Sequence, residues 1–175
     1  PQFLIDGGLL RTPYQDEEGS DSGSGNAPNY SDENLVTAME AFIAEFGRVY
    51  DGNQRIGFIQ IGMLGFWGEW HTHPHTDPNL NIAIPTSTKE RVVRAFHAAF
   101  SRTQLQIRYP FDLKHASLVA DPPGGFGPQG LVGSFGFHDD SFARYTLDGP
   151  ANGGENVGWH FWPTMLANNA QDSWR

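Results

Sequence analysis

The first long pattern of apolar and polar positions along this chain has the period of an α-helix. Ser31-Asp32-Glu33-Asn34 offers a cap and first-turn acids, and Asp51-Gly52-Asn53 ends the pattern. Spacings of three and four residues place the apolar side chains between them on one helix face. These side chains are Leu35, Met39, Phe42, Ile43, Phe46 and Val49. The sequence therefore predicts an amphipathic helix over residues 31–50.

A second helix is predicted over residues 87–100. Ser87-Thr88-Lys89-Glu90 has the pattern of a capping box, in which Ser and Glu satisfy each other's free backbone amides. The apolar positions that follow again recur at helical spacing. They are Val92, Val93, Phe96, Ala99 and Phe100.

Short apolar segments flank these helices and indicate strands. We expect strands within residues 1–10, 55–63, 104–109 and 131–137. Segment 55–63 is almost continuously apolar, which is typical of a strand buried on both faces of a parallel sheet. Residues 15–30 are rich in Gly, Ser and Asp, and we expect them to form an exposed loop.

Strands that alternate with helices at these distances predict an α/β fold with a parallel sheet and right-handed crossovers. Unusual polar residues follow the strands directly, at 69–77, 108–112 and 138–141. In a (β/α)₈ TIM barrel, this edge of the sheet carries the chemistry, and a full barrel needs roughly 200–250 residues. We therefore expect residues 1–175 to be a single (β/α)-barrel domain segment, completed by further segments or by other chains.

The composition of the chain excludes some classes of partner and of site. The 20 acidic and 11 basic residues give a formal net charge of −9, which disfavours nucleic acid as a partner. No apolar run approaches the roughly 20 residues that span a bilayer. Cysteine is absent, which excludes disulfides and thiolate metal ligands. The aromatic share of 13% suits either a sugar-binding cleft or a core.

The most informative segment is Gly65-Phe66-Trp67-Gly68-Glu69-Trp70-His71. It follows an apolar strand and places a carboxylate between two tryptophans. An anion there is costly to desolvate, which favours the protonated form that a general acid requires. Trp67 and Trp70 offer indole faces on which sugar rings can stack. The alternative is an ion pair for Glu69 and a core position for both tryptophans, but the two glycines favour a site that needs room.

Trp67-Gly68-Glu69-Trp70-His71 after an apolar strand resembles a family of glycoside-hydrolase-like (β/α)₈ barrels related to the large retaining clan of glycosidases. Residues 28–31, 50–52, 107–110 and 136–142 agree with that family, so the likeness covers about residues 28–142. The resemblance implies that Glu69 is the acid/base. It also implies a set of cleft residues: His71, Arg108, His138, Asp139 and Asp140. The competing interpretations are a turn cap for one of the two aspartates and a structural ion pair for the arginine.

Glycoside hydrolysis requires a second carboxylate, about 5–5.5 Å from the first for retention or about 6.5–9.5 Å for inversion. Glu155, in Asn152-Gly153-Gly154-Glu155-Asn156, is the candidate within this chain. No apolar strand precedes it, and Asp140 lies close before it in sequence. The alternatives are a nucleophile beyond Arg175 and no nucleophile at all.

The alternating histidines His71, His73 and His75 permit a different interpretation. Zinc accepts His and Asp ligands, so this loop is compatible with a metal-dependent hydrolase. Prolines in the loop and the few further ligands after later strands weigh against it. We therefore expect neither a metal nor an organic cofactor.

The sequence favours a secreted or cell-surface glycoside hydrolase that acts on a poly- or oligosaccharide. Glu69 would protonate the leaving oxygen and then activate water. The first alternative is a non-catalytic carbohydrate-binding or structural component of an extracellular assembly, and the second is the metal-dependent hydrolase. An acidic residue that faces Glu69 across the cleft would favour the enzyme over the binding protein.

Overall fold

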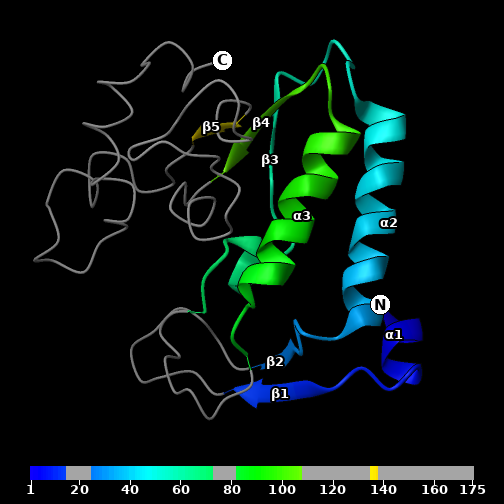
Figure 1. Cartoon of the computed structure of the whole chain (residues 1–175), viewed down its shortest axis with the longest axis vertical. Coiled ribbons are helices and arrows are strands. Elements are labelled where there is room, and N and C mark those ends of the chain that lie inside the picture. The colour runs from blue at the N-terminus through cyan, green and yellow to red at the C-terminus, as the bar shows by residue number, and fades with distance from the viewer. Residues whose placement is uncertain (15–24, 73–81, 108–134, 138–175) are drawn as a thin grey trace, which may run out of the picture.

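A computed structural model describes residues 1–14, 25–72, 82–107 and 135–137 (Figure 1). Helices α2 and α3 lie side by side, with a small sheet along one side of them and a hairpin near one end. The elements in chain order are α1 (Gln2–Asp6), β1 (Arg11–Tyr14), β2 (Gly25–Pro28), α2 (Glu33–Tyr50), β3 (Phe58–Gln60), the 3₁₀ turn η1 (Phe66–Gly68), α3 (Thr86–Ala99), β4 (Gln104–Ile107) and β5 (Phe135–Phe137).

Strands β3, β4 and β5 form a parallel sheet in chain order, which confirms the predicted parallel pairing. Leu105 and Ile107 of β4 are buried, and they belong to one apolar cluster with side chains of both long helices. The helices therefore cover one face of the sheet. Neighbouring parallel strands joined through a helix are the repeating unit of a (β/α)₈ barrel, and the complete barrel stays a prediction.

Strand β3 is shorter and more open than the apolar run 55–63 suggested. Its side chains at Phe58 and Gln60 are exposed, with Phe58 retaining 52% of its accessible surface. Ile61 and Leu64, which follow the strand, are fully buried instead. The expectation of a strand buried on both faces was wrong for the described residues, because the apolar run continues past the strand into the loop.

Helix α2 forms where the periodicity predicts it, but its buried face is shifted. Asp32 provides the cap, because its carboxylate accepts hydrogen bonds from the amides of Asn34 and Leu35 at 2.9 and 3.1 Å. Phe42 and Val49 of the predicted stripe lie outside the core, at 58% and 49% exposure. The buried positions of the helix are Leu35, Val36, Met39, Ile43 and Gly47.

Close approach of α3 explains this shift of the buried face. A Cβ atom at Gly47 would collide with the carbonyl oxygen of Ala99 at the end of α3. Glycine therefore lets the two helices touch at this end. Arg91 of α3 joins them further along, with ion pairs to Glu33 at 2.7 Å and Glu40 at 2.6 Å.

The predicted capping box of α3 was wrong. The helix begins at Thr86, after Pro85, and no side chain caps it. Thr88 instead donates its hydroxyl to the backbone carbonyl oxygen of Tyr30 at 2.8 Å and is 4% exposed. Ser87, which the capping box made the cap, instead lies within the helix. The apolar face of the helix is confirmed by the buried side chains of Val92, Val93 and Phe96.

Two predictions near the N-terminus were also wrong. The first segment is a short helix, α1, and not a strand, and a five-residue helix is too short for periodicity to reveal. Residues 25–30 are not part of an exposed loop: β2 pairs antiparallel with β1, and Ala27 and Tyr30 are 4% and 6% exposed. Pairing with β1 orders this Gly- and Asn-containing segment, and no local sequence pattern shows that pairing.

Asp51 joins the end of α2 to the segment that leads into β4. Its carboxylate accepts hydrogen bonds from the amides of Ser101, Arg102 and Thr103 at 3.2, 3.0 and 2.8 Å. Burial alone would raise the pKa of Asp51, but these hydrogen bonds outweigh it and hold the pKa well below its ordinary range. The ionised carboxylate therefore stabilises the folded state.

We predict that Asp51→Asn lowers the free energy of unfolding at pH 7 by about 2 kcal/mol, because hydrogen bonds to a charged acceptor are lost. The folded-state pKa lies below the unfolded value of about 3.9, so this stabilisation is fully present above that value and is lost as the pH falls from there through the folded-state pKa. Urea unfolding of both proteins between pH 7 and pH 2 checks this. The gap between them should close on acidification, and a constant gap would contradict the account. Glu45→Gln, which breaks an exposed pair with Arg48, is the control with little expected effect.

Candidate functional site

Residues 65–71, which follow β3, fold back on themselves as a closed loop. The amide of Phe66 donates to the carbonyl oxygen of His71 at 2.8 Å, and the amide of Trp70 donates to that of Leu64 at 2.8 Å. Gly65 has a φ of 76°, and a Cβ atom there would collide with the backbone of His71. Glycine is therefore required where the two ends of the loop meet.

The backbone of this region is strained. Among the residues that the structure describes, the non-glycine positions with positive φ are Met63 (78°), Trp67 (53°) and Trp70 (67°). Bulky side chains rarely adopt this region, and each such position costs on the order of 1–3 kcal/mol. Strain of this kind persists only where surrounding contacts enforce it, and it concentrates at binding and catalytic sites.

Tyr30 is one of the residues that enforce this conformation. Its hydroxyl accepts a hydrogen bond from the amide of Gly65 at 2.9 Å and donates to the carbonyl oxygen of the same residue at 3.3 Å. Burial raises the pKa of the Tyr30 phenol, while the hydrogen bond from the Gly65 backbone lowers it by less. The phenol therefore stays neutral and keeps both bonds. Tyr30 precedes α2 in the sequence, and no local pattern there indicated this long-range contact.

Trp70 anchors the other side of the loop. It is 2% exposed and belongs to the main apolar cluster, where its indole Nε1 donates to the carbonyl oxygen of Ile61 at 2.9 Å. From the sequence, we expected this side chain to stack on sugar rings. The structure places it in the core instead, so the surface role falls to Trp67.

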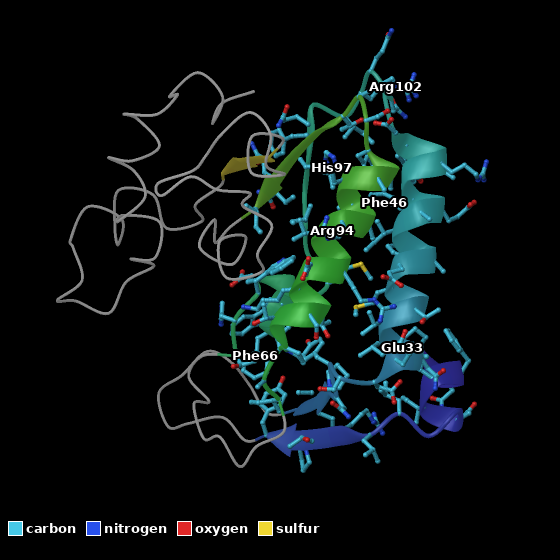
Figure 2. The ribbon with its side chains drawn as sticks, viewed as in Figure 1. Glu33, Phe46, Phe66, Arg94, His97 and Arg102 are labelled. Carbon is cyan, nitrogen blue, oxygen red and sulfur yellow. The ribbon has the colours of Figure 1, made fainter. Side chains whose placement is uncertain are left out.

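Trp67 lies on the outside of the loop and is 61% exposed. Its ring centroid is 5.9 Å from that of His71, with the planes tilted by 58°. The neighbouring Phe66 is buried and packs against Tyr14 of the β1–β2 hairpin, 4.6 Å between ring centroids. Figure 2 shows Phe66 at the hairpin end of the described structure and Arg102 at the opposite end.

Glu69 and His71 form a polar pair beside Trp67. The Oε2 atom of Glu69 lies 3.1 Å from Nε2 of His71, and the two side chains are 31% and 21% exposed. The expected enclosure of Glu69 between two tryptophans is therefore only partial: one indole is buried in the core and the other is open to solvent. A half-exposed carboxylate with a histidine partner can exchange a proton with a ligand or with water.

The remaining predicted site residues lie outside the described part of the chain. These are Arg108, His138, Asp139, Asp140 and Glu155, together with His73 and His75 of the metal hypothesis. Within residues 1–14, 25–72 and 82–107, no group of three His, Asp or Glu side chains is arranged to hold a metal ion. No helix in the same part of the chain is long and apolar enough to cross a membrane.

We predict unequal losses of stability for variants of the two tryptophans that flank Glu69. Trp70→Phe should lower the free energy of unfolding by about 2 kcal/mol, because it leaves the Ile61 carbonyl without its donor and opens space in the core. Trp67→Phe should change it by no more than about 0.5 kcal/mol, as is usual for an exposed side chain. Chemical denaturation of both variants measures this, and equal losses would show that the loop is packed differently.

Comparison of the chain with family models, with curated proteins and with solved structures found no match in any of the three. The geometry of residues 65–71 and the residues that support it are therefore the basis for a functional proposal.

Proposed function

We propose that this chain carries the acid/base half of a glycoside hydrolase active site, with Glu69 as the general acid and base. The observation that supports the proposal is the strained loop after β3, which presents the Glu69–His71 pair beside an exposed indole. In α/β folds with parallel strands, the loops at the carboxyl ends are the usual place for catalytic groups. The proposed (β/α)₈ barrel would place this loop at the mouth.

The polar pair suits proton transfer to a glycosidic oxygen. A general acid must reach the leaving oxygen and must then take a proton from the attacking water. Glu69 is open enough for a ligand to approach, and His71 holds one of its two carboxylate oxygens at 3.1 Å. That contact holds one of the two carboxylate oxygens in place beside the histidine.

Trp67 supports a sugar as the ligand. Its positive φ and its exposed apolar surface both cost free energy. The indole offers a flat apolar surface on which the face of a pyranose ring can stack. His71 lies next to the same indole. A ring that stacks on Trp67 would thus have its substituents near the Glu69–His71 pair.

The second carboxylate decides between the enzyme and a carbohydrate-binding protein. We propose Glu155 or a residue beyond Arg175 as the nucleophile, and neither belongs to the described residues. Without such a group, the same loop would bind a sugar and leave its linkage intact. Kinetics of a Glu69 variant separates these two functions.

We predict that Glu69→Gln reduces hydrolysis of unactivated oligosaccharides by about 10²–10⁴-fold, because the amide has no proton to give to the leaving oxygen. Dinitrophenyl glycosides have a leaving group, dinitrophenolate, that departs without protonation. With these substrates, Glu69→Gln should release the first equivalent of dinitrophenolate at the rate of the wild-type protein. Neutral hexasaccharides of the cello, xylo and manno series and the matching dinitrophenyl glycosides are the substrates.

The control for this experiment is Glu90→Gln, which removes an exposed ion pair with Arg94 on α3. Its turnover should equal that of the wild-type protein. Equal losses on both kinds of substrate in Glu69→Gln would contradict the role of acid. Sugar binding without turnover in the wild-type protein would establish the binding function in place of hydrolysis.

We predict that Trp67→Ala raises KM for the hexasaccharide by about tenfold and leaves kcat nearly unchanged. Loss of ring stacking costs on the order of 1 kcal/mol in binding, close to the 1.4 kcal/mol of a tenfold change. Trp67→Phe keeps an aromatic face and should retain most of the affinity. Steady-state kinetics checks both variants, and a loss confined to kcat would place Trp67 elsewhere in the mechanism.

A further inference from the structure

We propose that Gln60 and Gln106 form a hydrogen-bonding subsite for the hydroxyl groups of a neutral sugar, on the face of the sheet opposite the helices. This inference rests on the proposed function and adds the part of the site that recognises the ligand. Neither residue stood out in the sequence.

The register of the sheet brings the two amides together. Gln60 of β3 pairs with Gln106 of β4, which pairs in turn with Gly136 of β5. Neighbouring strands are about 4.8 Å apart, so the three positions form one row across the sheet. Leu105 and Ile107, which alternate with Gln106, are 2% and 1% exposed in the core under the helices. Gln106 therefore lies on the other face.

Gln106 is placed at an energetic cost. Its Oε1 atom is buried, and none of the described residues donates a hydrogen bond to it. A buried acceptor without a donor destabilises a fold, and native proteins keep few of them. The carbonyl would be satisfied by a ligand hydroxyl that reaches this face of the sheet.

The row of glutamines is connected to the Glu69 loop through a single residue. The amide of Ile61 donates to the backbone carbonyl oxygen of Gln106 at 2.8 Å, and the carbonyl oxygen of Ile61 accepts the indole N–H of Trp70 at 2.9 Å. Glu69 is the neighbour of Trp70 in the chain. Two hydrogen bonds thus link β4 at Gln106 to the catalytic loop, so both lie at the carboxyl end of the sheet.

The chemistry of the row fits an uncharged polyhydroxylated ligand. An amide side chain both donates and accepts, as each sugar hydroxyl does. Gln60 is exposed at the edge of the row, and Gly136 leaves its third position without a side chain. The row contains no charged group that would favour a phosphate or an acidic sugar.

The test compares three glutamine-to-methionine variants, which preserve side-chain size and remove the amide. We expect Gln106→Met to weaken binding of the preferred neutral hexasaccharide at least tenfold in isothermal titration, and to raise Tm because the buried acceptor is gone. Gln60→Met should weaken binding without raising Tm. Gln104→Met is the matched control: it lies on the same face two residues earlier, where its amide donates to the Leu105 carbonyl oxygen at 3.4 Å, and its affinity should be unchanged.

Each other outcome overturns the proposal. If the wild-type protein binds the hexasaccharide and Gln106→Met binds it equally well, the subsite is wrong and the role of Glu69 stands. If Gln106→Met loses affinity but Gln104→Met loses as much, the effect comes from the sheet and not from the row. If the wild-type protein binds none of the neutral hexasaccharides, the subsite and the proposed function fail together.

Discussion

The candidate site depends on the contacts that the buried indole of Trp70 makes. Its N–H bond to the Ile61 carbonyl oxygen ties the loop to the residue that follows β3, and its ring fills the core between the sheet and the helices. Burial of a tryptophan in a well-packed core is worth several kcal/mol, which is enough to offset the positive φ that Trp70 and Trp67 adopt. Tyr30 adds two hydrogen bonds at Gly65, and together they fix the turn that carries Glu69.

The contacts that stabilise the fold and the candidate site lie at opposite ends of the described structure. At one end, Asp51 satisfies three consecutive backbone amides that lead into β4, and Gly47 lets the helices touch. At the other end, the backbone is strained and an indole and an acid–histidine pair face solvent. In the proposed barrel, the candidate site would lie at the carboxyl ends of the strands.

The sequence predicted the features that depend on local periodicity and missed those that depend on distant partners. Helical spacing located α2 and α3, and the alternation of helices with apolar runs predicted the parallel sheet. It could not tell Trp67 from Trp70, because both flank Glu69 and burial of one indole depends on the core cluster and on the Ile61 carbonyl oxygen. Likewise, Ser87 was predicted to cap α3, but the helix begins before it, at Thr86. Gln106 was missed because its role depends on the register with β3.

The central claim is that a sugar ring stacks on Trp67 with its glycosidic oxygen at Glu69. A crystal structure of the Glu69→Gln protein with its preferred neutral hexasaccharide tests this most directly. We predict a pyranose face against the Trp67 indole and a glycosidic oxygen about 2.6–3.2 Å from the side-chain amide at position 69. A hexasaccharide bound away from residues 65–71, with the indole of Trp67 uncovered, would contradict it.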